Sequence, residues 1–327
     1  MLLPLSWTRF YYNWGAVPLA LIMPVSTVRV SLLRKRLEMF TRMLHGVEKG
    51  DVRALHRTRV ASRRLRELLP VLHVDAPLTR KLGRRLHKVT DRLGTVRELD
   101  VLLLVLDELH DPGRLSDHAL ARVRSAVEKE RAQAGERLFD KLPVAELHRL
   151  SERLNEVADD LGSVDAPEGR RADRATRWAI EAQAARRGER LANAMREAGA
   201  VYLPDRLHAV RIAVKKLRYA LELRDEVHGV KRSEDVRTLR RAQDLLGRMH
   251  DLQVLIERVR QVQAALTPPD STIWDEFDAL VDALENDCRR LHARYMRERD
   301  ALAAICASLA KRPKSGLRTV AVTTRAS

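Results

Sequence analysis

The chain has 327 residues, of which 45% are hydrophobic, 32% charged and only 4% aromatic, and its formal net charge is +16 at pH 7. The apolar fraction excludes wholesale disorder, and the near absence of β-branched alternation argues against a sheet-based core. So large a positive charge is typical of proteins that meet nucleic acid, an anionic membrane or a polyphosphate-like partner, although a general compositional bias toward Arg would also produce it.

The first 25 residues differ from the rest of the chain. Residues 10–28 carry no charge, as in a signal peptide or weak membrane anchor, but Asn, Gly and Pro interrupt the run and its apolar centre, 16–25, is short. We therefore expect 1–25 to be a disordered leader or the product of a start codon assigned too early, with Met23 as the true start. A membrane-bound protein is not expected.

From about residue 26 onward, apolar residues recur at the spacing of amphipathic helices, and Gly and Pro mark the breaks. Helices are expected in the first half (26–162) at 27–48, 51–72, 78–109, 115–140 and 144–162. In the second half (170–311) they are expected at 170–198, 204–227, 232–266 and 271–311. The stretch 163–169 has the composition of a linker, and 312–327 that of a basic disordered tail.

A histidine followed by a row of basic residues occurs once in each half. His56 recurs as His208, and every basic position from Arg59 to the end of the row recurs 152 residues later. On a helix these side chains share one face, opposite a face of leucine and valine. The first row is His56, Arg59, Arg63, Arg64 and Arg66, and the second is His208, Arg211, Lys215, Lys216 and Arg218.

A second repeated segment follows each row. Residues 93–103 match 246–256 at a spacing of 153, and just upstream Arg84 and Lys88 match Arg237 and Arg241. The matched glycines, Gly94 and Gly247, indicate a close helix crossing, or else a local break at the surface. A matched helix pair in each half predicts two homologous antiparallel helical bundles.

These segments resemble a known family. His-x-x-Arg-x-x-x-basic-basic-Leu-Arg (56–66 and 208–218), Leu-Gly-x-x-Arg-Glu-Leu-Asp-Val-Leu (93–102) and Leu-x-x-x-His-Asp-Leu-Gln-Val-Leu (246–255) are similar to segments of the CHAD family, the conserved histidine α-helical domain. The resemblance covers about 27–311. It implies an all-α fold of two bundles related by a pseudo-twofold axis, with a basic groove or pore between them. It also implies binding of inorganic polyphosphate, often at polyphosphate granules.

Polyphosphate fits a doubled cationic row, because it presents no base edges and needs only Arg and Lys donors. Direct phosphate contacts are expected from Arg59, Arg63, Arg66, Arg211, Lys215 and Arg218. Extension of the channel is expected from Arg64, Lys216, Arg84, Lys88, Arg237 and Arg241. His56 and His208 would donate hydrogen bonds, as imidazolium when a bound anion raises their pKa, or would instead bond within the bundle. Asp91, Asp100 and Asp244 either orient the arginines or are ordinary surface carboxylates.

Three other kinds of site are less well supported by the sequence. A metal is not expected, since no Cys, Asp or second His lies at ligand spacing beside the rows, and no cofactor is expected either. Nucleic acid is the first alternative partner, but no known binding motif is present and aromatic residues are scarce. Catalysis is not expected: the Glu-x-Glu-x-Lys hallmark of CYTH triphosphate-processing domains breaks at Ala132, after Glu128 and Glu130.

The sequence thus predicts a cytoplasmic, non-catalytic polyphosphate-binding protein that is located at polyphosphate granules or serves as an accessory partner of polyphosphate-metabolising or CYTH-type proteins.

Overall fold

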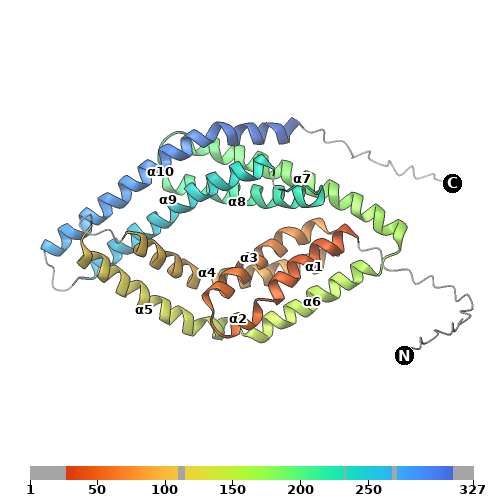
Figure 1. Ribbon diagram of the computed structural model, residues 1–327, viewed down its shortest axis with the longest axis horizontal. Coiled ribbons are helices and arrows are strands. Elements are labelled where there is room, and N and C mark those ends of the chain that lie inside the picture. Colours follow the sequence, from red (N-terminus) through yellow and green to blue (C-terminus); the bar gives the residue numbers. More distant parts are fainter. Residues whose placement is uncertain (1–26, 110–114, 232, 267–270, 312–327) are drawn as a thin grey trace, which may run out of the picture.

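The computed structural model describes residues 27–109, 115–231, 233–266 and 271–311, and every regular element within these ranges is helical, as predicted (Figure 1). The first half contains α1 (Val28–Thr41), α2 (Leu44–Glu48), α3 (Val52–Leu68), a 3-10 turn (Leu69–Val71), α4 (Ala76–Leu109), α5 (Asp117–Lys141) and α6 (Val144–Gly162). The second contains α7 (Ala166–Ala198), α8 (Pro204–Val227), α9 (Glu234–Ala264) and α10 (Ser271–Lys311). The expected leader (1–25) and tail (312–327) lie outside the described residues. None of the described helices is apolar over a length that would cross a bilayer.

The break between the halves is shorter than the expected 163–169. Helix α6 ends at Gly162, and α7 already begins at Ala166. The carboxylate of Asp165 accepts a hydrogen bond from the backbone N–H of Glu168 at 3.0 Å, which caps the new helix. Pro167 lies in the first turn, where its missing N–H costs nothing, so it starts the helix rather than breaking it.

In the described part of the chain, the buried apolar side chains form three cores rather than two. Leu65 of α3 lies in the core of the first half, and Leu217 of α8, its counterpart in the repeat, lies in the core of the second. A third core joins the halves: Leu106 at the end of α4 packs in one cluster with Leu255 of α9 and Leu284 of α10. The two long hairpins, α4–α5 and α9–α10, therefore meet through an apolar contact of their own.

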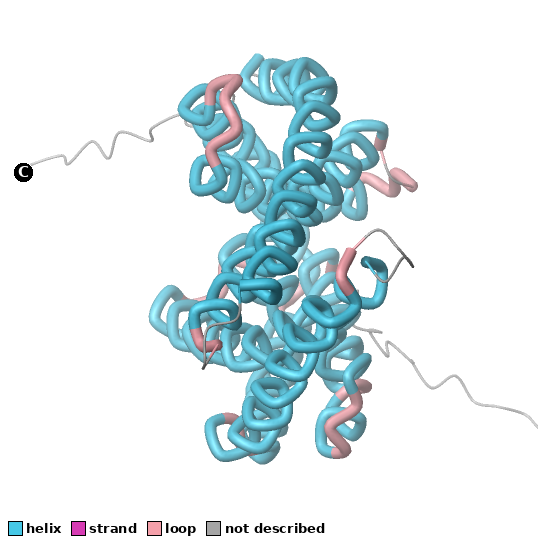
Figure 2. Tube along the Cα trace, turned by 90° about the vertical axis from the view of Figure 1, so that its left-hand side faces the viewer, coloured by secondary structure: helices cyan, strands magenta, loops and turns pink. Residues whose placement is uncertain are grey.

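The halves also meet at the other end of the molecule. Ile180 of α7 and Leu223 of α8 belong to the core of the first half. In Figure 1, α1–α6 lie below and α7–α10 above, and the two groups meet at both ends of the long axis. Figure 2 shows the same two groups connected through a narrower middle. This arrangement places α3 opposite α8, with an apolar contact on either side of the pair.

Truncating the matched leucines tests this division into cores. Leu65 and Leu217 are both fully buried, so Leu65→Ala and Leu217→Ala should each lower the free energy of unfolding by about 2–5 kcal/mol. Leu104→Ala is the control, because Leu104 is 51% exposed and should cost less than about 0.5 kcal/mol. Denaturant unfolding followed by circular dichroism measures all three; a cost at Leu217 as small as at Leu104 would contradict the second core.

Candidate anion-binding site

The basic rows of α3 and α8 lie close together between the halves. Arg59 and Arg63 of α3 and Arg211 and Lys215 of α8 are close enough for their charges to repel one another. We call these four residues the central cluster. All four are half-buried, and they come from the two copies of the repeated row. The sequence predicted both rows, and the fold brings their middle residues together.

The central cluster is electrostatically unfavourable without an anion. Burial, followed by repulsion from Arg63, Arg211 and Arg59, lowers the pKa of Lys215 to about 7. Burial and repulsion from Arg63 lower the pKa of Arg59 to about 10. The pKa of Arg211 is also lowered, mainly by burial. The lowered pKa values of Arg59, Arg211 and Lys215 mean that the positive charges of these three residues are poorly solvated.

Buried polar atoms in the site also lack partners. The Nε atoms of Arg59 and Arg63 and the Nδ1 atom of His56 are buried, and none of them has a hydrogen-bond partner. Buried polar atoms in proteins are nearly always paired, so atoms of this kind indicate where an acceptor from a ligand would fit. The three belong to one face of α3, which lies against α4 at Gly94 and Arg97 and within reach of the charges of Arg211 and Lys215 on α8.

Gly94 of α4 makes room for one of these side chains. A Cβ atom at Gly94 would lie 3.5 Å from Nε and 3.6 Å from Nη2 of Arg59, so the guanidinium rests against the glycine. A Cβ at Gly247 would meet nothing within 4 Å. The expectation that both glycines mark close helix crossings is wrong: Gly94 receives a side chain, and Gly247 faces open space.

The two histidines of the rows have different neighbours. His208 Nδ1 lies 3.3 Å from Nδ1 of His250, so one ring donates to the other. His56 instead lies near Arg97, which occupies the position matching His250; burial, then Arg97, lowers the pKa of His56. Burial also lowers the pKa of His208, and that of His250 falls to about 4. Without a bound anion these rings are therefore neutral at pH 7.

Two carboxylates that the sequence analysis did not select lie beside the central cluster. The charge of Glu98 opposes the lowering of the pKa at both Arg59 and Arg211, and the charge of Asp251 does so at Arg211. Burial raises the pKa of Asp251 itself. Glu98 and Asp251 match at the repeat spacing of 153, and that correspondence was the signal that could have found them.

Two of the three aspartates expected to orient the rows are engaged elsewhere. Asp100 accepts a hydrogen bond from Arg131 of α5 at 3.1 Å, and Asp91 pairs with His87 of its own helix at 3.1 Å. Asp244 is exposed on α9. The carboxylates whose charge reaches the central cluster are instead Glu98 and Asp251, which lie seven residues, or two helical turns, after Asp91 and Asp244.

On one side of the central cluster, Arg66 and Lys216 face α7. Burial, followed by repulsion from Arg187, Arg190 and Arg66, lowers the pKa of Lys216, and the charge of Glu67 opposes this shift. Arg187 forms an ion pair with Glu67, yet its Nη1 atom is buried without a hydrogen-bond partner. The arginines of α7 escaped the sequence analysis because they are not part of the repeat.

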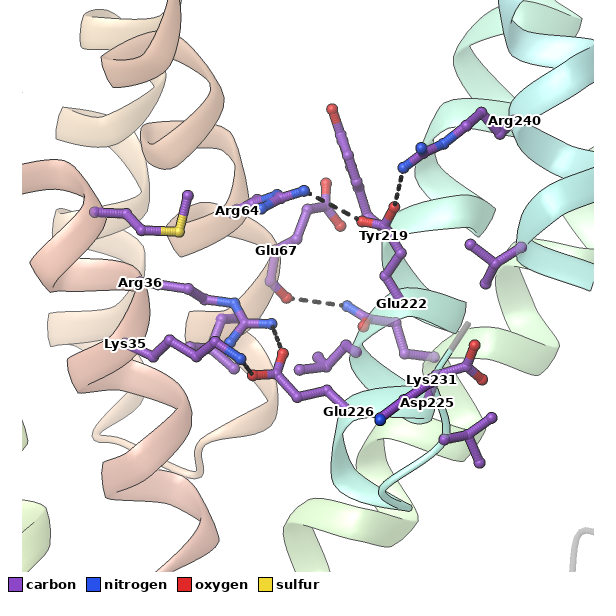
Figure 3. A pocket seen from close by; sticks show the side chains of 16 residues that line it. Lys35, Arg36, Arg64, Glu67, Tyr219, Glu222, Asp225, Glu226, Lys231 and Arg240 are labelled. Atoms are coloured by element: carbon purple, nitrogen blue, oxygen red, sulfur yellow. Dashed lines mark hydrogen bonds and ion pairs between the residues drawn. The ribbon is translucent and has the colours of Figure 1, made fainter. Parts of the chain in front are cut away.

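On the other side, Arg64 and Arg218 converge on a carboxylate. Glu222 of α8 pairs with both, and Arg218 is buried and also donates to Gln243 Oε1 at 2.8 Å. Figure 3 shows this region, a cavity of about 340 Å³ lined by residues of α1, α3, α7, α8 and α9, in which Arg240 also points toward Glu222.

Four of the predicted residues are not brought to the central cluster. Arg237 and Arg241 pair with Glu234 on α9, and Arg241 also lies 3.5 Å from Glu298 of α10. Arg84 and Lys88 are exposed on α4. Within the described residues, no group of three His, Cys, Asp or Glu side chains is arranged to hold a metal ion.

The comparisons with known proteins agree with this architecture. A family model of the CHAD domain matches residues 31–260, and the chain therefore belongs to the CHAD domain family. The CHAD domain from the plant Ricinus communis is 24% identical, with 87% of this chain and 91% of that chain covered and a TM-score of 0.54. PptA from Streptomyces chartreusis is 17% identical, with 86% and 97% covered and a TM-score of 0.56. A search of curated proteins finds no match.

Lys215 gives a test of the site in the free protein. Its pKa falls to about 7 on folding, so the folded state binds fewer protons than the unfolded state above that pH. Below pH 7 the buried charge of Lys215 therefore lowers the free energy of unfolding by its full amount. This destabilisation declines as the pH rises toward 10.5, the ordinary pKa of lysine. Lys215→Met should be more stable than the wild type at pH 6, with a difference that shrinks steadily between pH 7 and 10. Denaturant midpoints across this range measure the difference, and a constant difference would contradict the assignment.

Proposed function

We propose that this protein binds inorganic polyphosphate, without transforming it, through the central cluster and the cations beside it. The observation that carries this proposal is the approach of four like charges, Arg59, Arg63, Arg211 and Lys215, in a half-buried space where donor atoms lack partners. An anion placed among them would supply acceptors and raise the lowered pKa values. Membership of the CHAD domain family agrees with this ligand.

A linear polymer of phosphate suits the site better than a single phosphate. Arg59 and Arg66 are separated by seven residues of α3, which is about 10 Å along the helix axis, and the matching residues of α8 run beside them. A chain with one negative charge on each unit can satisfy several of these cations at once. By analogy with single-stranded nucleic acid, the logarithm of affinity should then fall by about 0.7 per contact for each tenfold rise in salt.

We further propose that the protein acts in the cytoplasm, at polyphosphate granules or beside polyphosphate-metabolising enzymes. No nucleophile with an adjacent base was found in the sequence, which supports a binding role rather than catalysis. Nucleic acid stays the alternative ligand, because phosphate contacts alone do not separate the two polymers.

Charge reversal in the central cluster tests the function. Arg59→Glu/Arg63→Glu should abolish retention of long-chain polyphosphate, because two cations become repulsive carboxylates. The matched control is Arg149→Glu/Arg153→Glu, with the same spacing and the same change in charge on exposed positions of α6, and it should retain most of the binding. Pull-down across a salt series measures retention, and helical circular dichroism reports folding. Equal loss in both variants would assign binding to net charge alone.

The same assay separates the alternatives. Duplex DNA or RNA at equal phosphate concentration should not displace polyphosphate, and displacement would favour the nucleic-acid reading. Release of orthophosphate by the purified protein with magnesium would overturn the non-catalytic role.

A further inference from the structure

Glu222 is surrounded by arginines from three helices. It pairs with Arg218 one turn earlier on α8, its Oε2 lies 3.6 Å from Nη2 of Arg64 on α3, and its Oε1 lies 3.9 Å from Nη2 of Arg240 on α9. The side chain is only 21% exposed, and Figure 3 shows it between the two halves with Arg64 and Arg240 pointing toward it. One carboxylate thus engages guanidinium groups from both halves.

The position of Glu222 on α8 places it in line with the cations. It follows Lys215 by seven residues, two helical turns, and therefore lies on the same face as Arg211 and Lys215. Glu226 is one turn further and accepts hydrogen bonds from Lys35 at 2.8 Å and Arg36 at 2.7 Å. The face of α8 that carries the basic row therefore changes from cationic to anionic after Arg218.

The carboxylate of Glu222 has no acidic counterpart in the first half of the repeat. The position in the first half that corresponds to Glu222 is Pro70, which cannot pair with any cation. Residues that correspond in the repeat consequently have different surroundings: Arg64 lies beside Glu222, whereas its counterpart Lys216 lies among Arg66, Arg187 and Arg190. Glu67 is the carboxylate on that side, and it pairs with Arg187, so three arginines there face one acidic group. The two sides of the central cluster are thus chemically unequal.

We propose that Glu222 acts as a built-in competitor for phosphate that closes one side of the binding path, so that a polyphosphate chain runs from the central cluster toward Lys216 and the arginines of α7. A carboxylate and a phosphate offer the same paired oxygens to a guanidinium, so Arg64, Arg218 and Arg240 are already occupied when the ligand arrives. This assignment rests on the proposed function, and it adds the direction in which the bound chain runs and the residue at which the binding path ends.

Removing the carboxylate of Glu222 should lengthen the path along which polyphosphate binds. In Glu222→Gln the half-buried Arg64 and the exposed Arg240 become free for the ligand. Affinity for long-chain polyphosphate should rise about tenfold near 0.1 M salt, with a salt slope steeper by about 0.7 for each arginine that engages. Tripolyphosphate is short enough to be held by the central cluster alone, so its affinity should change much less.

Glu234→Gln is the matched control. It removes one carboxylate, as Glu222→Gln does, and frees Arg237 while Arg241 keeps its contact with Glu298; both arginines lie apart from the central cluster. It should leave both affinities within about twofold of the wild type, since only net charge changes. Equal gains in the two variants, or a weaker affinity in Glu222→Gln, would overturn the proposal.

Circular dichroism shows whether Glu222→Gln folds, a necessary check because its partner Arg218 is buried. If this variant does not fold, two single substitutions in the otherwise native chain test the same idea. Lys216→Gln should weaken binding of long-chain polyphosphate several-fold, whereas Arg64→Gln, at the corresponding position of the repeat, should leave it nearly unchanged. A loss at Arg64 as large as at Lys216 would overturn the role of Glu222. Absence of binding by the wild type would instead refute the proposed function.

Discussion

Repulsion between like charges from the two halves of the chain is the constraint around which this structure is organised. Arg59 and Arg63 on α3 approach Arg211 and Lys215 on α8 in a space that water only partly reaches, where charges interact more strongly than at a free surface. Such an arrangement would push α3 and α8 apart if nothing else held them. The third core and the packing of α7 and α8 against the first half provide that restraint, one on each side of the charged pair.

The positions of the carboxylates determine which cations remain available to bind an anion. Glu98 and Asp251 lie beside the central cluster and moderate its charge, whereas Glu222 and Glu234 hold arginines that would otherwise extend it. The net charge of +16 is therefore a poor guide to the site. What matters is the small number of cations that lack a carboxylate partner and cannot be fully solvated.

Helix positions and the two basic rows could be predicted from the sequence because they depend on local periodicity, capping residues and an internal repeat. Helix is present in each predicted range, but 27–48 is divided into α1 and α2, and the range 51–72 ends in a 3-10 turn after Leu68. The linker is shorter than expected because Pro167 lies in the first turn of α7. Which cations converge could not be predicted in the same way. Periodicity assigns a side chain to a face of its helix, but not to the neighbour that covers that face.

Particular residues show the difference. Arg237 and Arg241 share a helix face in the sequence, yet Glu234 and Glu298 engage them outside the cluster. Arg187 contributes although it belongs to no repeat, and its position depends on how α7 crosses between the halves. The third core joins segments about 150 residues apart, and nothing local in either hairpin indicates its partner.

The most direct test of the account is the uptake of protons when polyphosphate binds. Calorimetric titration at pH 8 in two buffers with different heats of ionisation measures it. Because the pKa of Lys215 is about 7 in the free protein and an anion must raise it, the wild type should take up to about one proton more per molecule than Lys215→Met does. Tight binding with no difference in proton uptake between the two proteins would show that the polymer lies somewhere other than between α3 and α8.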